Sequence, residues 1–266
     1  MPRPGRVALY AGAVIAAWVA ALLVTDFAIE GRTRDQVASR IAEALQAEAT
    51  IGSGDLALVR GWLDLEALSV RRDDAIGQLA IDVAGLRCEL PPLGAALVDR
   101  DCRELAIRGT RLGVSSAAVF QLQRPHRAPL HAGRVVIDDA RLELAPSAVL
   151  PSLGRIAIDV AWAEAGETTF KTPVSWILAL HGLRATVELP AGITVELTYD
   201  HGELRAAGSL FGAMPIALPV SLPAADPAED PRAELARLVG FGKDLAERLV
   251  ARRAEDWLRS KLPLPR

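Results

Sequence analysis

LAIRGTRLGV, residues 105–114, carries the pattern that decides the fold. Leu105 and Ile107 are two residues apart, as are Leu112 and Val114, which is the spacing of a strand with one buried face. Ile107 and Leu112 are five apart, however, so unbroken alternation would send the second pair to the opposite face. A two-residue hairpin loop at Gly109-Thr110 would return all four side chains to one face, because Ile107 would then lie opposite Leu112.

The same spacing recurs along the chain: an apolar-x-apolar pair, four residues, and a second such pair. Further copies are Leu56, Leu58, Leu63, Leu65; Leu79, Ile81, Leu86, Cys88; Val135, Ile137, Leu142, Leu144; Leu197, Tyr199, Leu204, Ala206; and, more loosely, Leu178, Leu180, Ala185, Val187. The hairpin loops predicted in this way are Arg60-Gly61, Gly109-Thr110, Asp139-Ala140, Gly182-Leu183 and His201-Gly202. Most contain Gly, which tolerates positive φ. At Val83-Ala84 we expect a bulge within one longer strand instead. Because 51% of the chain is hydrophobic, some matches also arise by chance.

The β pattern occupies residues 51–222 and has helical patterns on both sides. Val37, Ile41 and Leu45 form a narrow apolar stripe, which predicts an amphipathic helix within 27–50. Residues 223–266 comprise a Pro-rich connector and a long amphipathic helix that we expect to begin at Pro231. The predicted fold is therefore mainly β with flanking helices, either a curved antiparallel groove or a sandwich of hairpins.

The N-terminal segment 1–26 contains a run without charge from Val7 to Thr25, which is long enough to cross a ~30 Å hydrocarbon core. Arg3 and Arg6 precede this run and Asp26 follows it, so the N-terminus is expected in the cytoplasm. A cleaved signal peptide is the rival interpretation, but its apolar region is usually shorter and ends at a small-x-small site. We therefore expect an uncleaved signal-anchor and a single-pass protein of the bacterial inner membrane with a periplasmic body.

The chain has two cysteines, Cys88 and Cys102, both in strand-like contexts. A disulfide between them would close a short loop and would fit an oxidising compartment. Two buried thiols that act as small hydrophobic side chains are the alternative.

The number of predicted strands raises the question of what covers their apolar face. About twelve strands at ~4.8 Å each would make an open sheet more than ~50 Å wide. A helix ~10–12 Å across covers two or three strands, so two helices along the strands would leave about half of this face exposed. The sheet could fold into a sandwich, the C-terminal helix could lie across the strands, or the face could bind an apolar guest. The aliphatic lining suits acyl chains, and it suits a plain core equally well.

The N-terminal half of the sequence resembles a known family of envelope proteins. A membrane anchor is followed by a short helix, by a first hairpin GDLALVRGWLDLEALSV (54–70), and by GQLAIDVAGLRCELPPLGAALVDRDCRELAIRGTRLGV (77–114). This arrangement is similar to the N-terminal region of AsmA-like proteins, the TamB-type lipid-transfer proteins of bacterial envelopes. The resemblance extends over roughly residues 7–145, and this chain is shorter than typical members.

The resemblance implies a periplasmic sheet with an apolar inner face that binds lipid acyl chains, in phospholipid transport or outer-membrane assembly. The residues expected on this face are Leu56, Leu58, Leu63, Leu65, Leu79, Ile81, Leu105, Ile107, Leu112, Val135, Ile137, Leu142, Leu144, Leu197 and Tyr199. The alternative is a structural or adaptor component of an envelope machine, similar to the type II secretion N protein, with a closed core and no ligand.

We expect no enzyme, cofactor or metal site, because HExxH, GxSxG and P-loop motifs are all absent from the sequence. A net charge of −3 and 5% aromatic residues give no reason to expect nucleic acid. The expected partners are membrane lipid and other envelope proteins. Arg71-Arg72 and Arg252-Arg253 could meet lipid head groups, although a solvated polar face is the preferred interpretation.

Overall fold

The structure is a computed structural model. It describes residues 17–21, 34–43, 45–57, 60–73, 78–91, 101–115, 130–145, 155–170, 173–208, 212–224 and 230–261. Of the predicted membrane anchor, 7–25, only residues 17–21 belong to this set, and they are helical. Among the described helices, none combines the length and the apolar character needed to span a bilayer.

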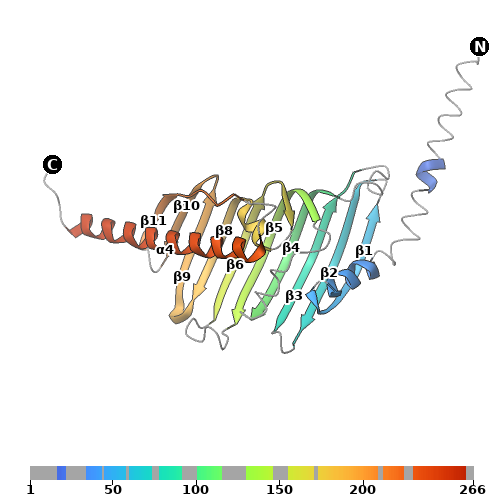
Figure 1. Ribbon diagram of the computed structural model, residues 1–266, viewed down its shortest axis with the longest axis horizontal. Helices are drawn as coiled ribbons and strands as arrows, with labels where there is room; N and C mark the ends of the chain where they lie inside the picture. Colours follow the sequence, from blue (N-terminus) through green and yellow to red (C-terminus); the bar gives the residue numbers. More distant parts are fainter. Residues whose placement is uncertain are drawn as a thin grey trace, which may run out of the picture.

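The described strands form one 11-stranded sheet, which confirms a mainly β fold (Figure 1). Its strands are β1 (Glu48–Ala57), β2 (Trp62–Arg72), β3 (Leu79–Glu89), β4 (Cys102–Ser115), β5 (Leu130–Ala145), β6 (Ile156–Ala165), β7 (Thr168–Phe170), β8 (Leu180–Leu189), β9 (Ile193–Asp200), β10 (Glu203–Gly208) and β11 (Gly212–Pro219). They follow one another in chain order across the sheet, except that β7 pairs with β5 and β8 pairs with β6. No second sheet faces this one within the described ranges, so the predicted sandwich is not found there.

One strand pair departs from the predicted antiparallel sheet. β4 and β5 are parallel, with Leu105 beside Val135 and Leu112 beside Leu142. A parallel neighbour requires the chain to return to the end of the sheet from which it started, which takes a connection of about a dozen residues. Residues 116–129 supply that length. All other neighbouring strands are antiparallel.

Two of the predicted hairpins are confirmed. β9 and β10 turn at His201-Gly202, both with positive φ, and Tyr199 lies opposite Leu204 as expected. β1 and β2 also form a hairpin, but β1 ends at Ala57 and β2 begins at Trp62, so four residues separate them instead of the predicted pair Arg60-Gly61. The register of this first hairpin differs by two residues from the prediction, because Leu56 lies opposite Leu63 and not opposite Leu65. The side chains stay on the same face, since a shift of two preserves the alternation.

The other predicted loops are wrong, because Gly109, Asp139 and Gly182 lie inside the long strands β4, β5 and β8. At the first two positions the strand continues through a residue of positive φ, 62° at Gly109 and 55° at Asp139. This single left-handed residue reverses the alternation, so Leu105 and Val114 are both buried, with 6% and 3% of their surface exposed. The predicted apolar face is thus preserved by a kink within a strand.

These kinks are aligned from strand to strand. Ala67 of β2, with φ 54°, and Gly109 of β4 lie opposite Ala84 of β3 from its two sides, and Asp139 of β5 lies beside Gly109. We call Ala67, Ala84, Gly109 and Asp139 the kink row. The register of β3 with both neighbours is unbroken at this level, so β3 is one continuous strand as expected, whereas the bulge expected at Val83-Ala84 is not found.

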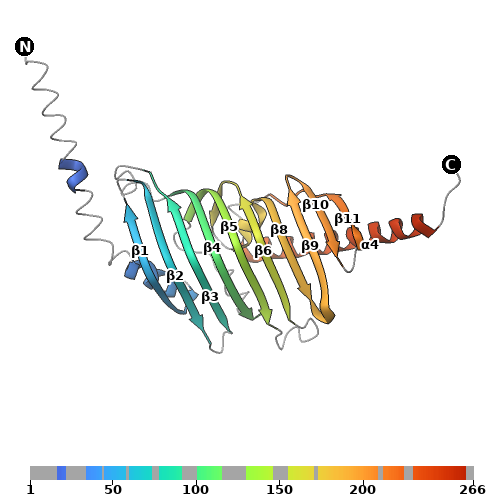
Figure 2. The ribbon, with the colours of Figure 1, turned by 180° about the vertical axis from the view of Figure 1, so that it is seen from behind.

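Helices cover the two ends of one face of the sheet, as the opposite views in Figures 1 and 2 show. Helix 34–43 packs over the first strands, where its apolar stripe meets a buried cluster of Ile51, Leu65, Leu68, Val70 and Val83. At the other end, α4 (Pro231–Lys261) packs through Phe241, Leu245 and Leu249 onto β9, β10 and β11. The short helix α3 (Pro173–Leu178) joins α4 through the buried pair Ser175 and Glu234, whose Oγ and Oε1 atoms are 3.2 Å apart.

The long helix α4 begins at Pro231 as expected and runs across the strands, which is one of the three predicted ways of covering the face (Figure 1). Its C-terminal part extends past β11 (Figure 1). On this helix, Val250 and Leu258 are 67% and 48% exposed. α4 therefore covers only one end of the sheet.

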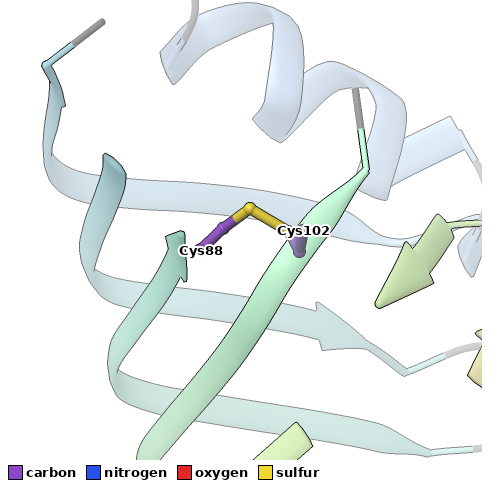
Figure 3. The surroundings of a disulfide bond; sticks show 2 residues. All are labelled: Cys88 and Cys102. Atoms are coloured by element: carbon purple, nitrogen blue, oxygen red, sulfur yellow. A yellow bond between two sulfur atoms is a disulfide. The ribbon is translucent and has the colours of Figure 1, made fainter. Parts of the chain in front are cut away.

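Cys88 and Cys102 form a disulfide, so this alternative is confirmed and that of two free thiols is wrong (Figure 3). The bond joins the end of β3 to the start of β4, and both residues are buried at 4% exposure. Disulfides persist in oxidising compartments, which agrees with the expected periplasmic body.

Candidate apolar binding site

The strand register aligns apolar side chains into rows that run across the sheet. One row lies on each side of the kink row. The first comprises Leu65, Leu86, Ile107, Ile137, Ala163, Leu183, Tyr199 and Leu204. The second comprises Val70, Ile81, Leu112, Leu142, Ile158, Val187 and Val195. We refer to the face that carries both rows as the inner face.

The ends of these rows lie beneath described helices, and most of the described residues between them are only half-buried. In the second row, Val70 beneath helix 34–43 is 1% exposed, and Val195 beneath α4 is 7% exposed. The residues between them on β3 to β6 are only half-buried. We call the half-buried residues of both rows on these four strands the central strip: Ile81, Leu86, Ile107, Leu112, Ile137, Leu142 and Ile158. They are aliphatic, so they offer contact area without directional hydrogen bonds.

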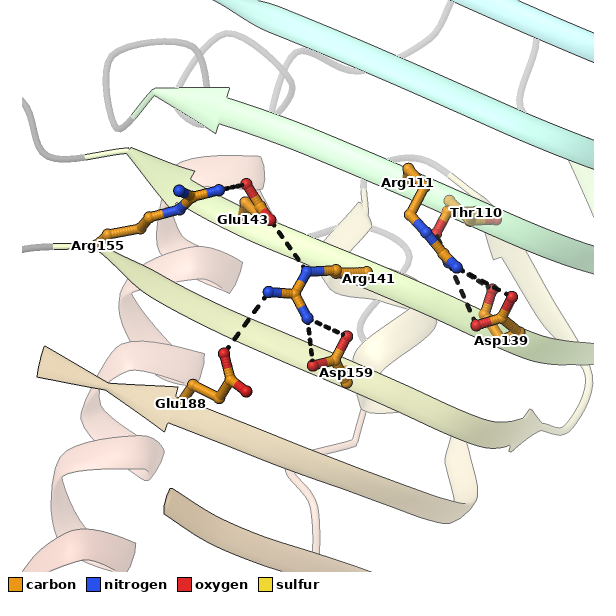
Figure 4. A network of polar contacts seen from close by, with 8 residues as sticks. All are labelled: Thr110, Arg111, Asp139, Arg141, Glu143, Arg155, Asp159 and Glu188. Carbon is orange, nitrogen blue, oxygen red and sulfur yellow. Dashed lines mark hydrogen bonds and ion pairs between the residues drawn. The ribbon is translucent and has the colours of Figure 1, made fainter. Parts of the chain in front are cut away.

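The opposite, outer face of the sheet is lined by ion pairs (Figure 4). Arg141 of β5 contacts Glu143, Asp159 and Glu188 at 3.0, 2.6 and 3.6 Å, while α4 passes behind the strands in this view. The guanidinium groups of Arg141 and Arg155 donate hydrogen bonds to Glu143 and hold the pKa of this carboxyl below its ordinary value.

A second ion-pair group lies at the other end of the outer face. Arg134 is placed between Glu104 and Glu164, 2.9 Å from each. The hydrogen bond from Arg134 lowers the pKa of the Glu164 carboxyl. Among the described residues, the two apolar rows therefore lie on the inner face and these ion pairs lie on the outer face.

The residues predicted for the lipid-facing side fall into three groups. Leu58 lies outside the described residues. Fully buried are Leu65, Leu79, Leu105 and Val135. Half-buried are Leu56, Leu63, Ile81, Ile107, Leu112, Ile137, Leu142, Leu144, Leu197 and Tyr199.

The structure brings most of these residues together. One cluster collects Leu79, Ile81, Leu112, Leu142 and Leu144, and another collects Leu63, Leu105, Ile107, Val135, Ile137 and Tyr199. The residues expected on the lipid-facing side did not include Ile158, Leu183 and Val187, although Val187 belongs to the looser copy of the apolar spacing. Ile158 belongs to the alternating stretch 155–160 and could have been found from it.

A pocket of about 1020 Å³ lies at one end of the strands. It is bounded by the end of the N-terminal amphipathic helix and by the ends of β1 to β6, and its lining includes the apolar residues Leu79 and Val114. At its edge Arg72 is 8% exposed and donates a hydrogen bond from Nη1 to the Leu45 carbonyl, at 2.8 Å.

No group of three or more metal-ligating side chains is found in the described part of the chain. The chain matches no protein-family model, and no curated protein sequence is significantly similar to it. The similarity to AsmA-like proteins therefore stays a prediction, and a functional assignment depends on the geometry of the site itself.

Proposed function

We propose that this protein binds lipid acyl chains along its central strip and acts in phospholipid transport or envelope assembly at the bacterial inner membrane. The proposal places the N-terminus in the cytoplasm and the sheet in the periplasm. It assigns a binding role and no catalytic one. Its observation is the central strip itself, a band of aliphatic side chains on β3 to β6 that are only half-buried among the described residues.

The energetics of the central strip favour an apolar guest. Each methylene group removed from water contributes roughly 0.8 kcal/mol, so a chain with eight methylenes against the strip would gain roughly 6 kcal/mol before the loss of its freedom. The half-buried residues come from four adjacent strands, which present one continuous surface. The disulfide agrees with the proposed compartment, because such bonds persist outside the cytoplasm.

The test is to purify the full chain from membranes and to measure bound phospholipid by native mass spectrometry. A matched pair of variants on β5 separates the two faces: Leu142 is half-buried on the inner face and Val136 is half-buried on the outer face. Wild type and Val136→Gln should carry phospholipid, whereas Leu142→Gln should carry several-fold less. Lipid-free wild-type protein, or an equal loss in the two variants, would refute the proposal.

The C-terminal part of α4 favours a second candidate function, that of an adaptor in an envelope assembly. Val250 and Leu258 of this helix are exposed apolar side chains, as a protein-binding helix would present. An adaptor would be free of lipid, and the double variant Val250→Ser/Leu258→Ser would lose its partner on co-purification. Retention of the partner by this variant would exclude the role for this part of α4.

A further inference from the structure

The two edges of the sheet differ in their capacity to pair with another strand. The strand order begins at β1 and ends at β11, so each of these strands has one edge that pairs with no other described strand (Figure 1). Such an edge presents a row of backbone N–H and C=O groups to a partner. β11 contains Pro215 and Pro219, which lack an N–H and so limit pairing. β1 contains no Pro in its ten residues. The edge of β1 is therefore the better surface for strand addition.

The alternation of side chains along β1 is reset at the middle of the strand. Its inner-face positions are Ala49, Ile51, Gly54 and Leu56, which lie opposite Val70, Leu68, Leu65 and Leu63 of β2. Between them, Gly52 lies at the level of the kink row, since a Cβ added to it would be 2.9 Å from that of Ala67. The inner-face positions of β1 are therefore symmetric about the point between Gly52 and Ser53.

This symmetry matches β1 to an antiparallel copy of itself. With a two-fold axis between Gly52 and Ser53, Gly52 of one copy lies opposite Ser53 of the other, and Ile51 lies opposite Gly54. Inner-face positions then meet inner-face positions along the whole strand, and the kink row continues into the second copy. A shift of one residue would place inner-face positions opposite outer-face positions. The pattern of β1 thus selects one register.

The outer-face side chains of β1 fit the same register. Glu48 would lie opposite Ala57 of the second copy, and Thr50 opposite Asp55, so that neither carboxylate faces a carboxylate directly. Like charges in such positions would be destabilising. Thr50 and Asp55 are both exposed, and a threonine hydroxyl can donate a hydrogen bond to a carboxylate. Pairing over the full strand would add about ten backbone hydrogen bonds between the copies.

We propose that β1 pairs with β1 of a second copy of this chain, antiparallel and about a two-fold axis between Gly52 and Ser53. The two sheets then form one continuous sheet with a common inner face. The contact is isologous, so it closes at two copies and leaves only the Pro-containing β11 strands at the outer edges. This inference is independent of lipid binding, because it depends only on the edge of β1.

The experiment measures the mass of the full chain in detergent micelles by sedimentation equilibrium over a range of protein concentrations. Wild type should be a dimer. Thr50→Asp should raise the dissociation constant several-fold, because each of the two symmetry-related pairs would then oppose two carboxylates. Thr50→Lys is the matched control and should dimerise as well as wild type or better. The charge exchange Thr50→Asp/Asp55→Lys should restore the dimer. A monomeric wild type, or an equal effect of Thr50→Asp and Thr50→Lys, would overturn the proposal.

Crosslinking between copies tests the register directly. A mixture of the variants Thr50→Cys and Asp55→Cys should be joined by a short thiol crosslinker, because these two positions lie opposite each other across the axis. A mixture of Thr50→Cys and Arg111→Cys should not be joined, since Arg111 is equally accessible but lies on β4. A dimer without the link between positions 50 and 55 would show that the copies associate through another surface and would overturn pairing through β1.

Discussion

Replacing Gly109 by Ala tests whether the kink row determines the fold. Gly109 has φ 62°, and a Cβ added to it would lie 2.7 Å from the Cβ of Ala84 on the neighbouring strand. The left-handed backbone costs a residue other than Gly roughly 1–2 kcal/mol, and the close contact adds roughly 1–3 kcal/mol. We therefore expect the free energy of unfolding to fall by roughly 2–5 kcal/mol. Urea denaturation of the full chain, followed by tryptophan fluorescence, measures this change.

A second substitution separates the two contributions. Ala84→Gly removes the methyl group that the new Cβ would meet, and on its own costs about 0.5–1 kcal/mol as a glycine within a strand. In the double variant Gly109→Ala/Ala84→Gly, the contact is relieved and only the backbone strain remains. The double variant should then lose roughly 1–3 kcal/mol less free energy of unfolding than the sum of the losses in the two single variants. A neutral Gly109→Ala variant, or strictly additive effects, would refute a kink held by positive φ and close strand contact.

Three other perturbations have definite expected results. Cys88 and Cys102 are separated by 14 residues. Replacing both by Ser should lower the free energy of unfolding, measured by urea denaturation, by about 3 kcal/mol. The carboxyl of Glu164 has a pKa below its ordinary value of 4.5, so its ion pair stabilises the protein above that pH and is lost as the pH falls through the lowered pKa. Melting temperatures at pH 7 and pH 3 should therefore differ less in Glu164→Gln than in wild type. Leu79→Ala should cost roughly 2–5 kcal/mol, because Leu79 is 1% exposed, and Leu142→Ala on the central strip should cost about half as much in the same assay. Equal costs would mean that Leu142 is as fully packed as Leu79.

The sequence predicts which face of each strand is apolar, and it does so even where the predicted cause is wrong. At Gly109 a hairpin turn and a kink within a strand require the same thing, a residue of positive φ that resets the alternation. The local pattern cannot distinguish the two. In a hairpin, the residues after the turn form a neighbouring strand, whereas after a kink they continue the same strand. At His201-Gly202 the chain does turn back, and there the expected pairing of Tyr199 with Leu204 is confirmed.

Long-range features could not be predicted in this way. The parallel pairing of Leu105 with Val135 depends on the path of the intervening segment, which leaves no periodic signal in either strand. The pocket depends on the strand ends of β1 to β6 lying at one rim, which follows from the whole strand order. The pairing of Cys88 with Cys102 was an open alternative, because spacing alone does not show where two side chains point.

The parallel contact between β4 and β5 divides the sheet into two sections, β1 to β4 and β5 to β11. On either side of it, each strand neighbours one that is close in sequence, so β1 to β4 and β5 to β11 can each form by short loop closures. The contact between them requires the longest closure along the main order of the sheet. We therefore expect the two sections to assemble separately and to join late, so that a partly folded chain exposes the unpaired edges of β4 and β5 at this boundary.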